Sequence, residues 1–540
     1  MTTNRREFLA LAATSVMVTV GVGYGARAQS VLPAPVFDAN LVFDVRRFGA
    51  SGDGRRNDTR AINAAIEAAN KAGGGVVLFP AGTYACYTIR LKSHVTLYLG
   101  PGATLLAAST PHDGAAAEGY DLPESNAPWE SYQDFGHNHW RNSLIWGEGL
   151  QDIAIIGSGR IWGRGLSRGH SEDLDLPRAE APGVGNKSIA LKNCRNVLLR
   201  DFSILDGGHI GILATGVDDL TIDNLTIDTN RDGMDIDCCR NVRISNCTVN
   251  SPYDDGICLK SSYALGYARP TENVTISNCY VSGDYAVGTL LDGTRKRLGH
   301  SADGPVWGRT GRIKCGTESN GGFKAITIVN CVFEGCRGFA LETTDGGALE
   351  DITFSNIVMR DIGNAPFFFR LGNRMRGPAG ASIGSFKRVL ISNVTCVSSG
   401  VATPSLLVGL PEHPLEDIKI SDVFLSQPGG GSAAMVAARP LESAVDYPEP
   451  GMFGALPACG LYVRHARNLE LSHIEIALRT PDPRPTCWIE DVDGFDVFGF
   501  HAPQPRTAAA FQLKQVRNVR LLGGRGVPDL QIPDATDRSV

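Results

Sequence analysis

Residues 241–249 read Asn-Val-Arg-Ile-Ser-Asn-Cys-Thr-Val, and this stretch decides the fold because close copies of it recur along the chain. Each copy has an alternating apolar run, a polar step and a second short apolar run. Alternation with a period of two predicts a β-strand, and recurrence at roughly 20–50 residues predicts a stacked repeat. The copies are residues 196–204, 241–249, 273–281, 325–333, 351–359, 388–396, 417–425 and 468–476.

The repeat predicts an all-β chain folded as a parallel β-helix, because each coil buries its inward face only by stacking on the next. Asn tolerates the left-handed backbone of a sharp corner, and stacked Asn side chains can hydrogen-bond along the axis. We therefore expect an Asn ladder at the step. Its members are Asn246, Asn278, Asn330, Asn356 and Asn393.

The cysteines follow the same repeat. Cys194, Cys247, Cys279 and Cys331 come directly after the step, so we expect them to point inward and stack as small hydrophobes. The chain has 13 cysteines, an odd number, so at least one thiol has no disulfide partner. The remaining cysteines lack CxxC spacing and neighbouring histidine pairs, and we expect no zinc site at them.

The two ends and the composition set the domain organisation. Arg5-Arg6, an interrupted apolar stretch and Ala26-Arg-Ala28 predict a Tat-type signal peptide over residues 1–28 and a periplasmic or secreted protein. Residues 29–540 would form one catalytic β-helix, with an N-terminal cap at about 40–100, coils at about 150–480, and C-terminal coils and a tail to 540. A net charge of −6 argues against a nucleic-acid partner.

A helix is predicted near the start of this domain. Asp58 is placed to cap a segment in which Ile62 and Ile66 have helical spacing, and Gly73 to Gly75 end it. A terminal coil of a solenoid needs an amphipathic cover over its open core. We expect this helix to be that cover.

Four carboxylates fall on what would be adjacent coils. Asp232 and Asp235 lie about one repeat before the adjacent pair Asp254 and Asp255. Ionised neighbours repel and nothing about folding requires them, so the cluster indicates acid/base hydrolysis of a glycosidic bond. The alternatives are a calcium site, which takes oxygen ligands, or solvated acids in turns.

Several motifs together resemble glycoside hydrolase family 28, the polygalacturonases and rhamnogalacturonan hydrolases, over about residues 43–359. They are Phe48-Gly-Ala-Ser-Gly-Asp-Gly54, Gly73-Gly-Gly-Val-Val-Leu-Phe-Pro-Ala-Gly-Thr-Tyr84, Asp232-Gly-Met-Asp-Ile-Asp237 and Asp254-Asp-Gly-Ile257. The resemblance implies a single-stranded right-handed parallel β-helix and inverting hydrolysis by three aspartates, with no cofactor and no metal.

The resemblance also implies a role for each acid. Asp254 would be the general acid, and Asp232 and Asp255 would orient and deprotonate the water; Arg231 stands where the family has Thr. An inverting pair needs carboxyl groups about 6.5–9.5 Å apart, which neighbouring coils with some lateral offset can supply. Clustered acids would also raise one carboxyl pKa and keep a proton available.

The chain departs from the family at the basic motif that grips the substrate carboxylate. Arg312-Ile-Lys314 lies one coil early, and Ala340 and Glu342 occupy the usual basic places. Either Arg312 and Lys314 reach the same pocket and bind an acidic sugar, or the sugar is not an acid and Glu342 with Asp345 binds its hydroxyls. A third interpretation is that both cations face solvent.

Four further features border the expected groove. His209 would line it or bond to a turn, and Asp235 would support the acids if a bend brings it to their side of the strand. Arg370, with Arg374, is the next candidate for binding a uronate, since a guanidinium binds a carboxylate bidentately. The inserted segment 284–310, which contains Trp307, would wall off one end and favour exo action.

We therefore expect an exported glycosidase that cleaves α-linked galacturonosyl bonds in pectic polysaccharide or oligosaccharide. Branched or rhamnogalacturonan-type pectin is favoured over plain homogalacturonan, because the usual basic places are vacated. A β-helix polysaccharide lyase and a non-catalytic carbohydrate-binding solenoid are the rival interpretations. We expect a monomer with no membrane contact after the signal is removed.

Overall fold

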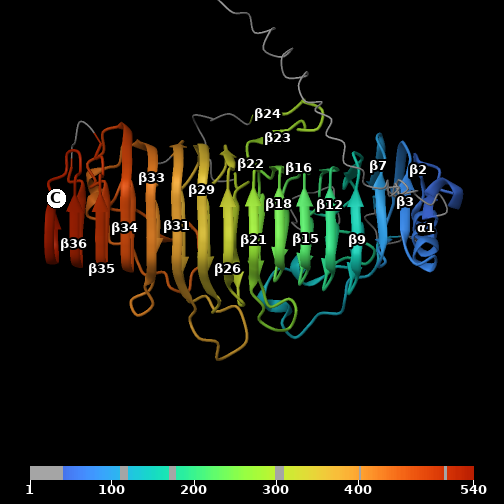
Figure 1. Ribbon diagram of the computed structural model, residues 1–540, viewed down its shortest axis with the longest axis horizontal. Coiled ribbons are helices and arrows are strands. Elements are labelled where there is room, and N and C mark those ends of the chain that lie inside the picture. Colours follow the sequence, from blue (N-terminus) through green and yellow to red (C-terminus); the bar gives the residue numbers. More distant parts are fainter. Residues whose placement is uncertain (1–40, 110–118, 169–177, 298–308, 401–402, 504–507) are drawn as a thin grey trace, which may run out of the picture. The chain divides into compact units, whose positions relative to one another are not determined.

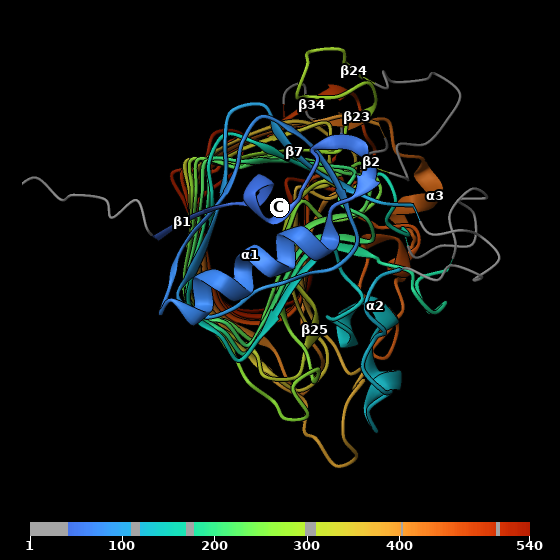
Figure 2. The same cartoon turned by 90° about the vertical axis from the view of Figure 1, so that its right-hand side faces the viewer.

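The computed structural model describes residues 41–109, 119–168, 178–297, 309–400, 403–503 and 508–540. The expected signal peptide and Trp307 lie outside these residues. The described strands form three parallel sheets that wind around one core (Figures 1 and 2), which confirms the right-handed parallel β-helix. None of the described helices has the length and apolar composition that a membrane-spanning helix needs.

The first sheet holds the alternating runs that define the repeat, and each of its strands pairs in register with the next coil. Its separate strands are β1 (Val42–Asp44), β3 (Gly75–Phe79), β6 (Val95–Leu99), β9 (Gln151–Ile156), β12 (Arg195–Arg200), β15 (Asp218–Asp223), β18 (Arg240–Ser245), β21 (Thr271–Ser277) and β26 (Phe323–Val329).

The second sheet follows the polar step of each repeat and consists of short strands. They are β2 (Asp53–Asn57), β4 (Gly82–Cys86), β7 (Ala103–Ala107), β10 (Arg160–Trp162), β13 (Ser203–Leu205), β16 (Thr226–Asp228), β19 (Thr248–Asn250), β22 (Tyr280–Ser282) and β27 (Val332–Glu334).

The third sheet carries the acids and basic residues singled out in the sequence. Its strands are β5 (Ile89–Arg90), β8 (Ile145–Glu148), β11 (Lys187–Lys192), β14 (Ile210–Thr215), β17 (Asp232–Asp237), β20 (Ile257–Ser261), β25 (Ile313–Ser319), β28 (Phe339–Thr343), β30 (Phe367–Leu371) and β32 (Ser405–Val408).

In the later coils one strand runs through more than one sheet. These long strands are β29 (Ala348–Ile362), β31 (Ser385–Ser398), β33 (Leu415–Gly429), β34 (Leu461–Thr480), β35 (Cys487–Phe498) and β36 (Phe511–Leu522). The last strand, β37 (Leu530–Ser539), pairs antiparallel with β36. This reversed strand covers the final coil, so the stack does not end in an open parallel edge.

The Asn ladder is confirmed. All five predicted residues have left-handed φ angles between 54° and 57°. The Asn246 amide donates to the Asp223 carboxylate, and each later amide donates to the side-chain carbonyl oxygen of the preceding Asn, at 3.4 Å for Asn278 to Asn246 and 3.2 Å for Asn393 to Asn356. The same corner of each coil is thus fixed by one residue type that bonds along the axis.

The interior of the coils is apolar, and all 13 cysteines are buried and unpaired. Cys194, Cys247, Cys279 and Cys331 pack in this core, as predicted. Burial raises the pKa of the Cys194 thiol, so this thiol packs as a small apolar side chain.

Helix α1 (Thr59–Lys71) lies across the N-terminal end of the core (Figure 2). It buries Ile62, Ala65, Ile66 and Ala69, so the predicted cover is confirmed. The predicted capping bond is wrong. The Asp58 carboxylate accepts instead from the backbone N–H groups of Ser51 and Gly52, at 2.7 and 3.0 Å, and so ties the preceding loop to the helix start.

Three segments leave the regular coils. The first, residues 119–143, contains η3 (Glu130–Tyr132) and α2 (Phe135–Asn138). The second contains the hairpin of β23 (Tyr285–Val287) and β24 (Lys296–Arg297), and the third, residues 430–458, contains α3 (Ala433–Val436) and η4 (Pro450–Phe453). Seen along the axis, α2 and α3 lie outside the coils on the same side (Figure 2).

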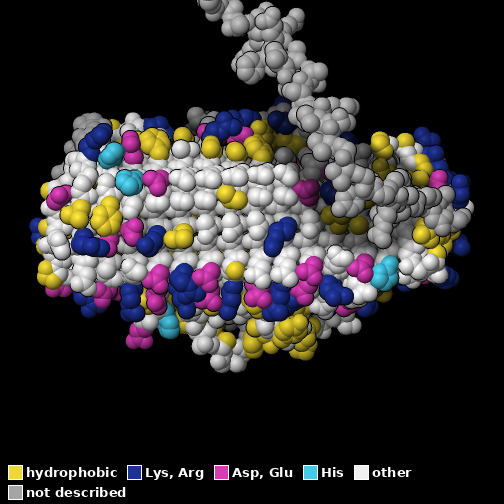
Figure 3. Space-filling model, in the orientation of Figure 1, with side chains coloured by type: hydrophobic (Ala, Val, Ile, Leu, Met, Phe, Trp, Pro, Cys, Tyr) yellow, Lys and Arg dark blue, Asp and Glu magenta, His cyan; other side chains and the backbone are white. Residues whose placement is uncertain are grey.

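The surface of the first sheet differs from that of the third sheet in the side chains that it carries (Figure 3). Most of its surface is neither hydrophobic nor charged, and a band of mixed charges follows one edge. Ion pairs join successive coils there, such as Arg240 with Glu272 at 2.8 Å and Lys324 with Glu350 at 3.2 Å. Opposite charges on neighbouring rungs reduce the repulsion that identical stacked charges would produce.

Candidate active site

The acids gather on the outer face of the third sheet. Met234 and Ile236 of β17 pack in the core, so Asp235 faces outward by alternation. The Asp232 carboxylate also lies with those of Asp254 and Asp255, although strict alternation would place it on the side of Met234. Between Asp232 and Met234, Gly233 packs tightly on the next coil, because a Cβ atom there would lie only 2.4 Å from the Gly256 carbonyl oxygen.

Asp232, Asp254 and Asp255 form one cluster. One carboxylate oxygen from each lies within 4.8 Å of the others. These nearest-oxygen distances are shorter than the gap between carboxyl groups expected of an inverting pair. The close approach is possible because cations flank the cluster, namely Arg231 on one side and Arg312 with Lys314 on the other.

Asp254 differs from its two neighbours in exposure. Its side chain is 29 % exposed, whereas Asp232 and Asp255 are buried. Its Oδ2 accepts from Arg231 Nη2 at 2.8 Å, and its Oδ1 accepts from the Asp255 backbone N–H at 3.1 Å. Asp254 is therefore the cluster member that a bound substrate meets first.

The three acids have different electrostatic environments. Burial raises the pKa of Asp232 well above its usual range, and Asp235 and Asp254 add to the rise. Burial and Asp255 also raise the pKa of Asp254, against the attraction of Arg231. Burial acts to raise the pKa of Asp255 too, but Lys314 and Arg312 outweigh it and hold that pKa below its usual range. The cluster thus favours a protonated and an ionised carboxyl side by side.

Arg312 and Lys314 reach the acids from the coil after the acid pair. Arg312 Nε donates to Asp255 Oδ1 at 2.9 Å, and Lys314 Nζ lies 3.3 Å from Asp255 Oδ2. They are only 1 % and 3 % exposed, which rules out the interpretation that they face solvent. That they hold a sugar carboxylate stays a prediction.

The register of the third sheet agrees with the coil alignment made from sequence. Lys314 pairs with Ala340 on the next coil, and Glu342 pairs with Arg370 on the coil after that. Glu342 is fully buried and lies 3.3 Å from Lys314 Nζ, so it balances the buried cations. Burial raises the pKa of Glu342, with Lys314 acting against the rise.

Arg370 lies outside the cluster. Its side chain is fully buried and donates to the backbone carbonyls of Gly409, Glu442 and Ser443, at 3.1, 2.8 and 3.0 Å. The structure therefore contradicts the expectation that Arg370 faces the groove. Its guanidinium is occupied in holding the segment 430–458 on the coils.

Asp345 and Arg374 are also occupied with each other. The Asp345 carboxylate accepts from Arg374 Nε at 3.0 Å and from the Arg376 backbone N–H at 3.0 Å. Asp345 is buried, so it does not present a free carboxylate to sugar hydroxyls. The pair fixes the turn that follows β28.

Two buried polar groups beside the acids come from residues that the sequence did not single out. His137 of α2 lies with Nε2 2.8 Å from Asp235 Oδ2. Lys260 of β20 donates to Glu318 Oε2 at 3.0 Å. Lys260 follows the Asp-Asp-Gly-Ile motif by three residues, which was the available signal; nothing in the sequence linked His137 to a strand 98 residues later.

His209 lies at the N-terminal border of the site. Its Nδ1 lies 3.2 Å from the Arg168 carbonyl oxygen, and its ring centroid is 6.1 Å from that of His137. Burial lowers the pKa of His209 well below its usual range, and Arg231 lowers it further. The contact with a backbone carbonyl agrees with one of the two sequence interpretations. That His209 lines the groove stays a prediction.

Two apolar clusters close the outer face on either side of the acids. On the N-terminal side Trp140 packs with Ala190, Ile210, Leu213 and Ala264 over β11 and β14. Trp140 Nε1 also donates to Thr215 Oγ1 at 3.1 Å. The segment 119–143 is therefore a wall over β11 and β14 that reaches β17 through His137.

The opposite wall is the segment 430–458. Phe453, Leu456 and Ala458 pack with Ala340 and Phe368 over β28 and β30. From this wall Glu449 Oε1 accepts from Arg312 Nη2 at 3.1 Å, and the Tyr447 hydroxyl lies 3.0 Å from Thr317 Oγ1. Tyr447 is 49 % exposed and lies 6.0 Å from Lys314 Nζ, so its ring stands at the edge of the site.

The hairpin of the inserted segment borders the corner between the second and third sheets. The Leu290 backbone N–H donates to Asp228 Oδ2 at 2.7 Å, and Arg297 pairs with Glu334 and Asp361. Residues 298–308 lie outside the described part, so closure of the groove by Trp307 stays a prediction. The two walls on the third sheet come from other segments.

Both groups of possible metal ligands within the described residues lie here. The Asp232, Asp254 and Asp255 carboxylates would suit a hard cation such as Ca²⁺. Arg231, Arg312 and Lys314 already compensate two of these acids, so a cation would compete with them. The second group is Asp134, His137 and His209, whose nitrogen and oxygen donors suit a transition metal.

Comparisons with known proteins find relatives in sequence and in fold. Residues 42–283 match the family model described as rhamnogalacturonase A/epimerase, pectate lyase-like. A probable polygalacturonase of Vitis vinifera is 25 % identical over 402 residues, which cover 70 % of this chain and 73 % of that protein.

Two solved structures share the fold. An exopolygalacturonase from Thermotoga maritima has a TM-score of 0.59 and 19 % identity, covering 81 % of this chain and 91 % of that one. The family 28 exopolygalacturonase of Yersinia enterocolitica has a TM-score of 0.58 and 20 % identity, covering 85 % and 78 %. The matches in sequence and in fold support the assignment of the chain as a family 28-like glycoside hydrolase.

Proposed function

We propose that this family 28-like protein hydrolyses α-linked galacturonosyl bonds in pectic polysaccharide or oligosaccharide. The observation that carries the proposal is the cluster of Asp232, Asp254 and Asp255, with oxygens within 4.8 Å between flanking cations. Acid/base hydrolysis needs one carboxyl that holds a proton beside one that is ionised, and burial opposed by Lys314 and Arg312 produces that difference.

In the proposed mechanism Asp254 protonates the leaving oxygen. Its carboxyl is the most exposed of the three and its pKa is raised, so it can carry a proton to the bond. Asp255, kept ionised by Lys314 and Arg312, orients the water and accepts its proton, and Asp232 completes the water site. Inversion at the anomeric carbon rests on the resemblance, because the close spacing of the acids does not itself select the stereochemical outcome.

The cations around the site support an acidic sugar. Each of the three cations Arg231, Arg312 and Lys314 pairs with a carboxylate of the acid cluster. Their positive charge favours a substrate that brings carboxylates of its own. The half-exposed ring of Tyr447 beside Lys314 offers an apolar face for a sugar ring. The vacated place at Ala340 favours branched or rhamnogalacturonan-type pectin over plain homogalacturonan.

Exo action is supported by the two walls. The Trp140 cluster covers β11 and β14, and the Phe453 cluster covers β28 and β30, so a polymer has little open sheet beyond the acids. A site bounded in this way favours a chain end over the middle of a long chain.

The test is product analysis on a panel of pectic substrates. The full chain and Asp254→Asn are incubated with polygalacturonate and with a rhamnogalacturonan backbone, and products are separated by chromatography. We expect saturated monomers or dimers, new reducing ends with little loss of viscosity, and no products from the variant; proton NMR of the first product reports the anomer. Unsaturated products that absorb in the ultraviolet would instead establish a lyase.

We also propose Tat-dependent export, on the basis of Arg5-Arg6 and Ala26-Arg-Ala28. Replacing both Arg5 and Arg6 by Lys should leave the protein uncleaved in the cytoplasm, whereas the parent appears cleaved in the periplasm or medium. Equal export of the two forms would show that another signal directs the chain. The expectation of a monomer is checked by light scattering on the same purified sample.

A further inference from the structure

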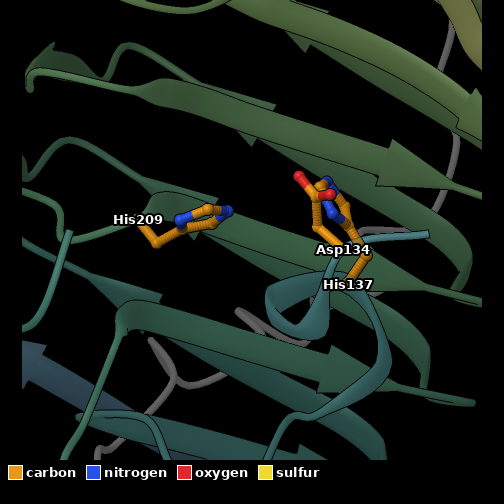
Figure 4. A group of neighbouring side chains, drawn as sticks. All are labelled: Asp134, His137 and His209. Carbon is orange, nitrogen blue, oxygen red and sulfur yellow. The ribbon is translucent and has the colours of Figure 1, made fainter. Parts of the chain in front are cut away.

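Two histidines and an aspartate meet beside the acids, where the segment 119–143 lies against the coils. Asp134 and His137 come from the start of α2, and His209 comes from the turn before β14. One donor atom from each lies within 4.8 Å of the others. Figure 4 shows the His209 ring pointing toward the Asp134 and His137 side chains.

Each histidine has one ring nitrogen held by an acceptor. His209 Nδ1 lies 3.2 Å from the Arg168 carbonyl oxygen, which can only accept, so this nitrogen carries the hydrogen. His137 Nε2 lies 2.8 Å from Asp235 Oδ2 and donates to that carboxylate in the same way. When both rings are neutral, the opposite nitrogens, His209 Nε2 and His137 Nδ1, hold lone pairs.

These two lone pairs have no partner among the described residues. His209 Nε2 and His137 Nδ1 are both buried without a hydrogen bond, and both residues are 5 % exposed. A buried polar atom without a partner is unfavourable, so both nitrogens call for a partner.

The carboxylate of Asp134 has the same character. Asp134 precedes α2 in the N-cap position, yet its side chain makes no capping hydrogen bond. The side chain turns toward His137 instead (Figure 4). It is exposed, so the site has one open side through which an ion can enter.

Glycine at position 136 makes the arrangement possible. A Cβ atom there would lie 2.8 Å from His209 Cδ2 and 3.1 Å from Nε2. Any side chain at this position would push α2 away from His209. The turn of α2 is therefore fitted to the imidazole ring.

We propose that Asp134, His137 and His209 bind one divalent transition-metal ion of the Zn²⁺ type, with water in the fourth position. Two imidazoles and one carboxylate are a known ligand set for catalytic zinc, with bonds of about 2.0–2.2 Å. The outer-sphere contacts match those of metal-binding histidines, which donate their second N–H to a carboxylate or a backbone carbonyl. Asp235 and the Arg168 carbonyl fill these two positions.

The ion would join the wall formed by residues 119–143 to β14 and β17. It would hold His137 on Asp235, and Asp235 lies next to the acid cluster. Its role is therefore to position the wall, and the site stands apart from the proton transfers assigned to Asp254 and Asp255.

The test is metal binding by the full chain, purified without a histidine tag and stripped of metal with a chelator. Titration calorimetry with Zn²⁺ should give one ion per chain, and the unfolding temperature should rise with Zn²⁺. Co²⁺ in its place should show the intense visible absorption of a four-coordinate ion.

Four variants assign the ion to its ligands. His209→Gln and Asp134→Asn should each weaken Zn²⁺ by more than the ~10–100-fold that loss of an outer-sphere partner brings, and Gly136→Ala should weaken it without removing a ligand. His473→Ala removes an exposed imidazole elsewhere and should bind as the parent does. Asp134 is exposed, so its variant is expected to fold even if the histidine variant does not.

Asp254→Asn separates this site from the acid cluster. It should lose hydrolysis and keep stoichiometric Zn²⁺, whereas loss of Zn²⁺ in this variant alone would place the ion on the acids and overturn the proposal. Absence of saturable binding by the parent, or unchanged binding by Asp134→Asn and His209→Gln, would overturn it as well. Neither result bears on whether the chain cleaves pectin.

Discussion

Two regions of the same coils differ in whether their side chains repeat. One is the corner between the first and second sheets, and the other is the outer face of the third sheet. Along the corner one residue type repeats, and each Asn bonds to the Asn of the next coil. Along the third sheet each coil contributes a different side chain at the same register position. That row is Leu213, Asp235, Cys258, Lys314, Ala340 and Phe368.

The difference shows how a repeating fold accommodates a non-repeating site. Identical neutral side chains bond along the axis without charge, so the corner stabilises any coil that joins the stack. Identical acids in one row would repel, whereas this row holds a single acid and a single cation, and walls from distant segments cover the coils on either side. The repeated Asn corner stabilises the fold, and the candidate active site lies on the face where the side chains do not repeat.

The largest expected effect tests the proton donor on the outer face of the third sheet. Asp254→Asn should lower kcat by ~10²–10⁴-fold, the range for a lost general acid, with unchanged unfolding. The control is Asn393→Gly in the repeated row, which should keep full kcat. Reducing-end assays on both proteins measure the effect, and near-parent activity of Asp254→Asn would remove Asp254 from the proposed mechanism.

The next effect tests the buried cations. Arg312 faces Asp255, Glu342 and Glu449, at 2.9, 3.7 and 3.1 Å. Arg312→Ala leaves these carboxylates without their cation and should lower the free energy of unfolding by about 3–5 kcal/mol.

The matched control for Arg312 is Lys419→Gln on the exposed first sheet. Lys419 pairs with Glu470 at 3.1 Å, but its side chain is 54 % exposed, so the loss should stay below about 1 kcal/mol. Urea unfolding of both variants gives the two values. Equal losses would mean that burial does not distinguish the two faces.

The two rows also differ in how well the sequence predicts them. The ladder, the buried cysteines and the α1 cover were predictable because each follows from a local period repeated many times. The acids were predictable from their motifs, and the coil alignment correctly separated Lys314 from Ala340. Features that repeat, and residues that belong to a motif, can be predicted from the sequence.

The rest of the site depends on contacts that no local pattern encodes. His137 meets Asp235 from 98 residues away, and Glu449 meets Arg312 from 137 residues away. Asp232 joins Asp254 and Asp255 although strict strand alternation would place it on the side of Met234. Arg370 has the residue type expected of a uronate clamp, but its guanidinium is bonded to backbone carbonyls of a wall that the sequence did not predict.

A third prediction tests the repeated row itself. Asn330 donates to Asn278 and accepts from Asn356, at 3.3 and 3.2 Å, with φ at 57°. Asn330→Ala loses both bonds and places Ala in the left-handed region, so the free energy of unfolding should fall by about 2 kcal/mol. Asn330→Gly should lose less because glycine adopts this φ freely. Equal losses would assign the whole effect to the hydrogen bonds, and kcat should be unchanged in both.

The smallest expected change in the free energy of unfolding is an increase. Asp232→Asn should abolish most activity yet raise the free energy of unfolding at neutral pH, on the order of 1 kcal/mol. Burial, Asp235 and Asp254 raise the pKa of Asp232 in the folded state above its unfolded value. At any pH above the unfolded value the carboxyl therefore opposes folding, and below that value the opposition vanishes because both states are protonated.

The gain from Asp232→Asn should accordingly be present at pH 7 and absent near pH 3, a dependence measured by urea unfolding at the two values. A ladder variant such as Asn330→Ala contains no titrating group and should lose the same free energy at both. If Asp232→Asn destabilises the protein at pH 7, the Asp232 carboxylate makes favourable contacts that outweigh its burial. The contrast between the stabilising Asn corner and the acid cluster would then fail at this residue.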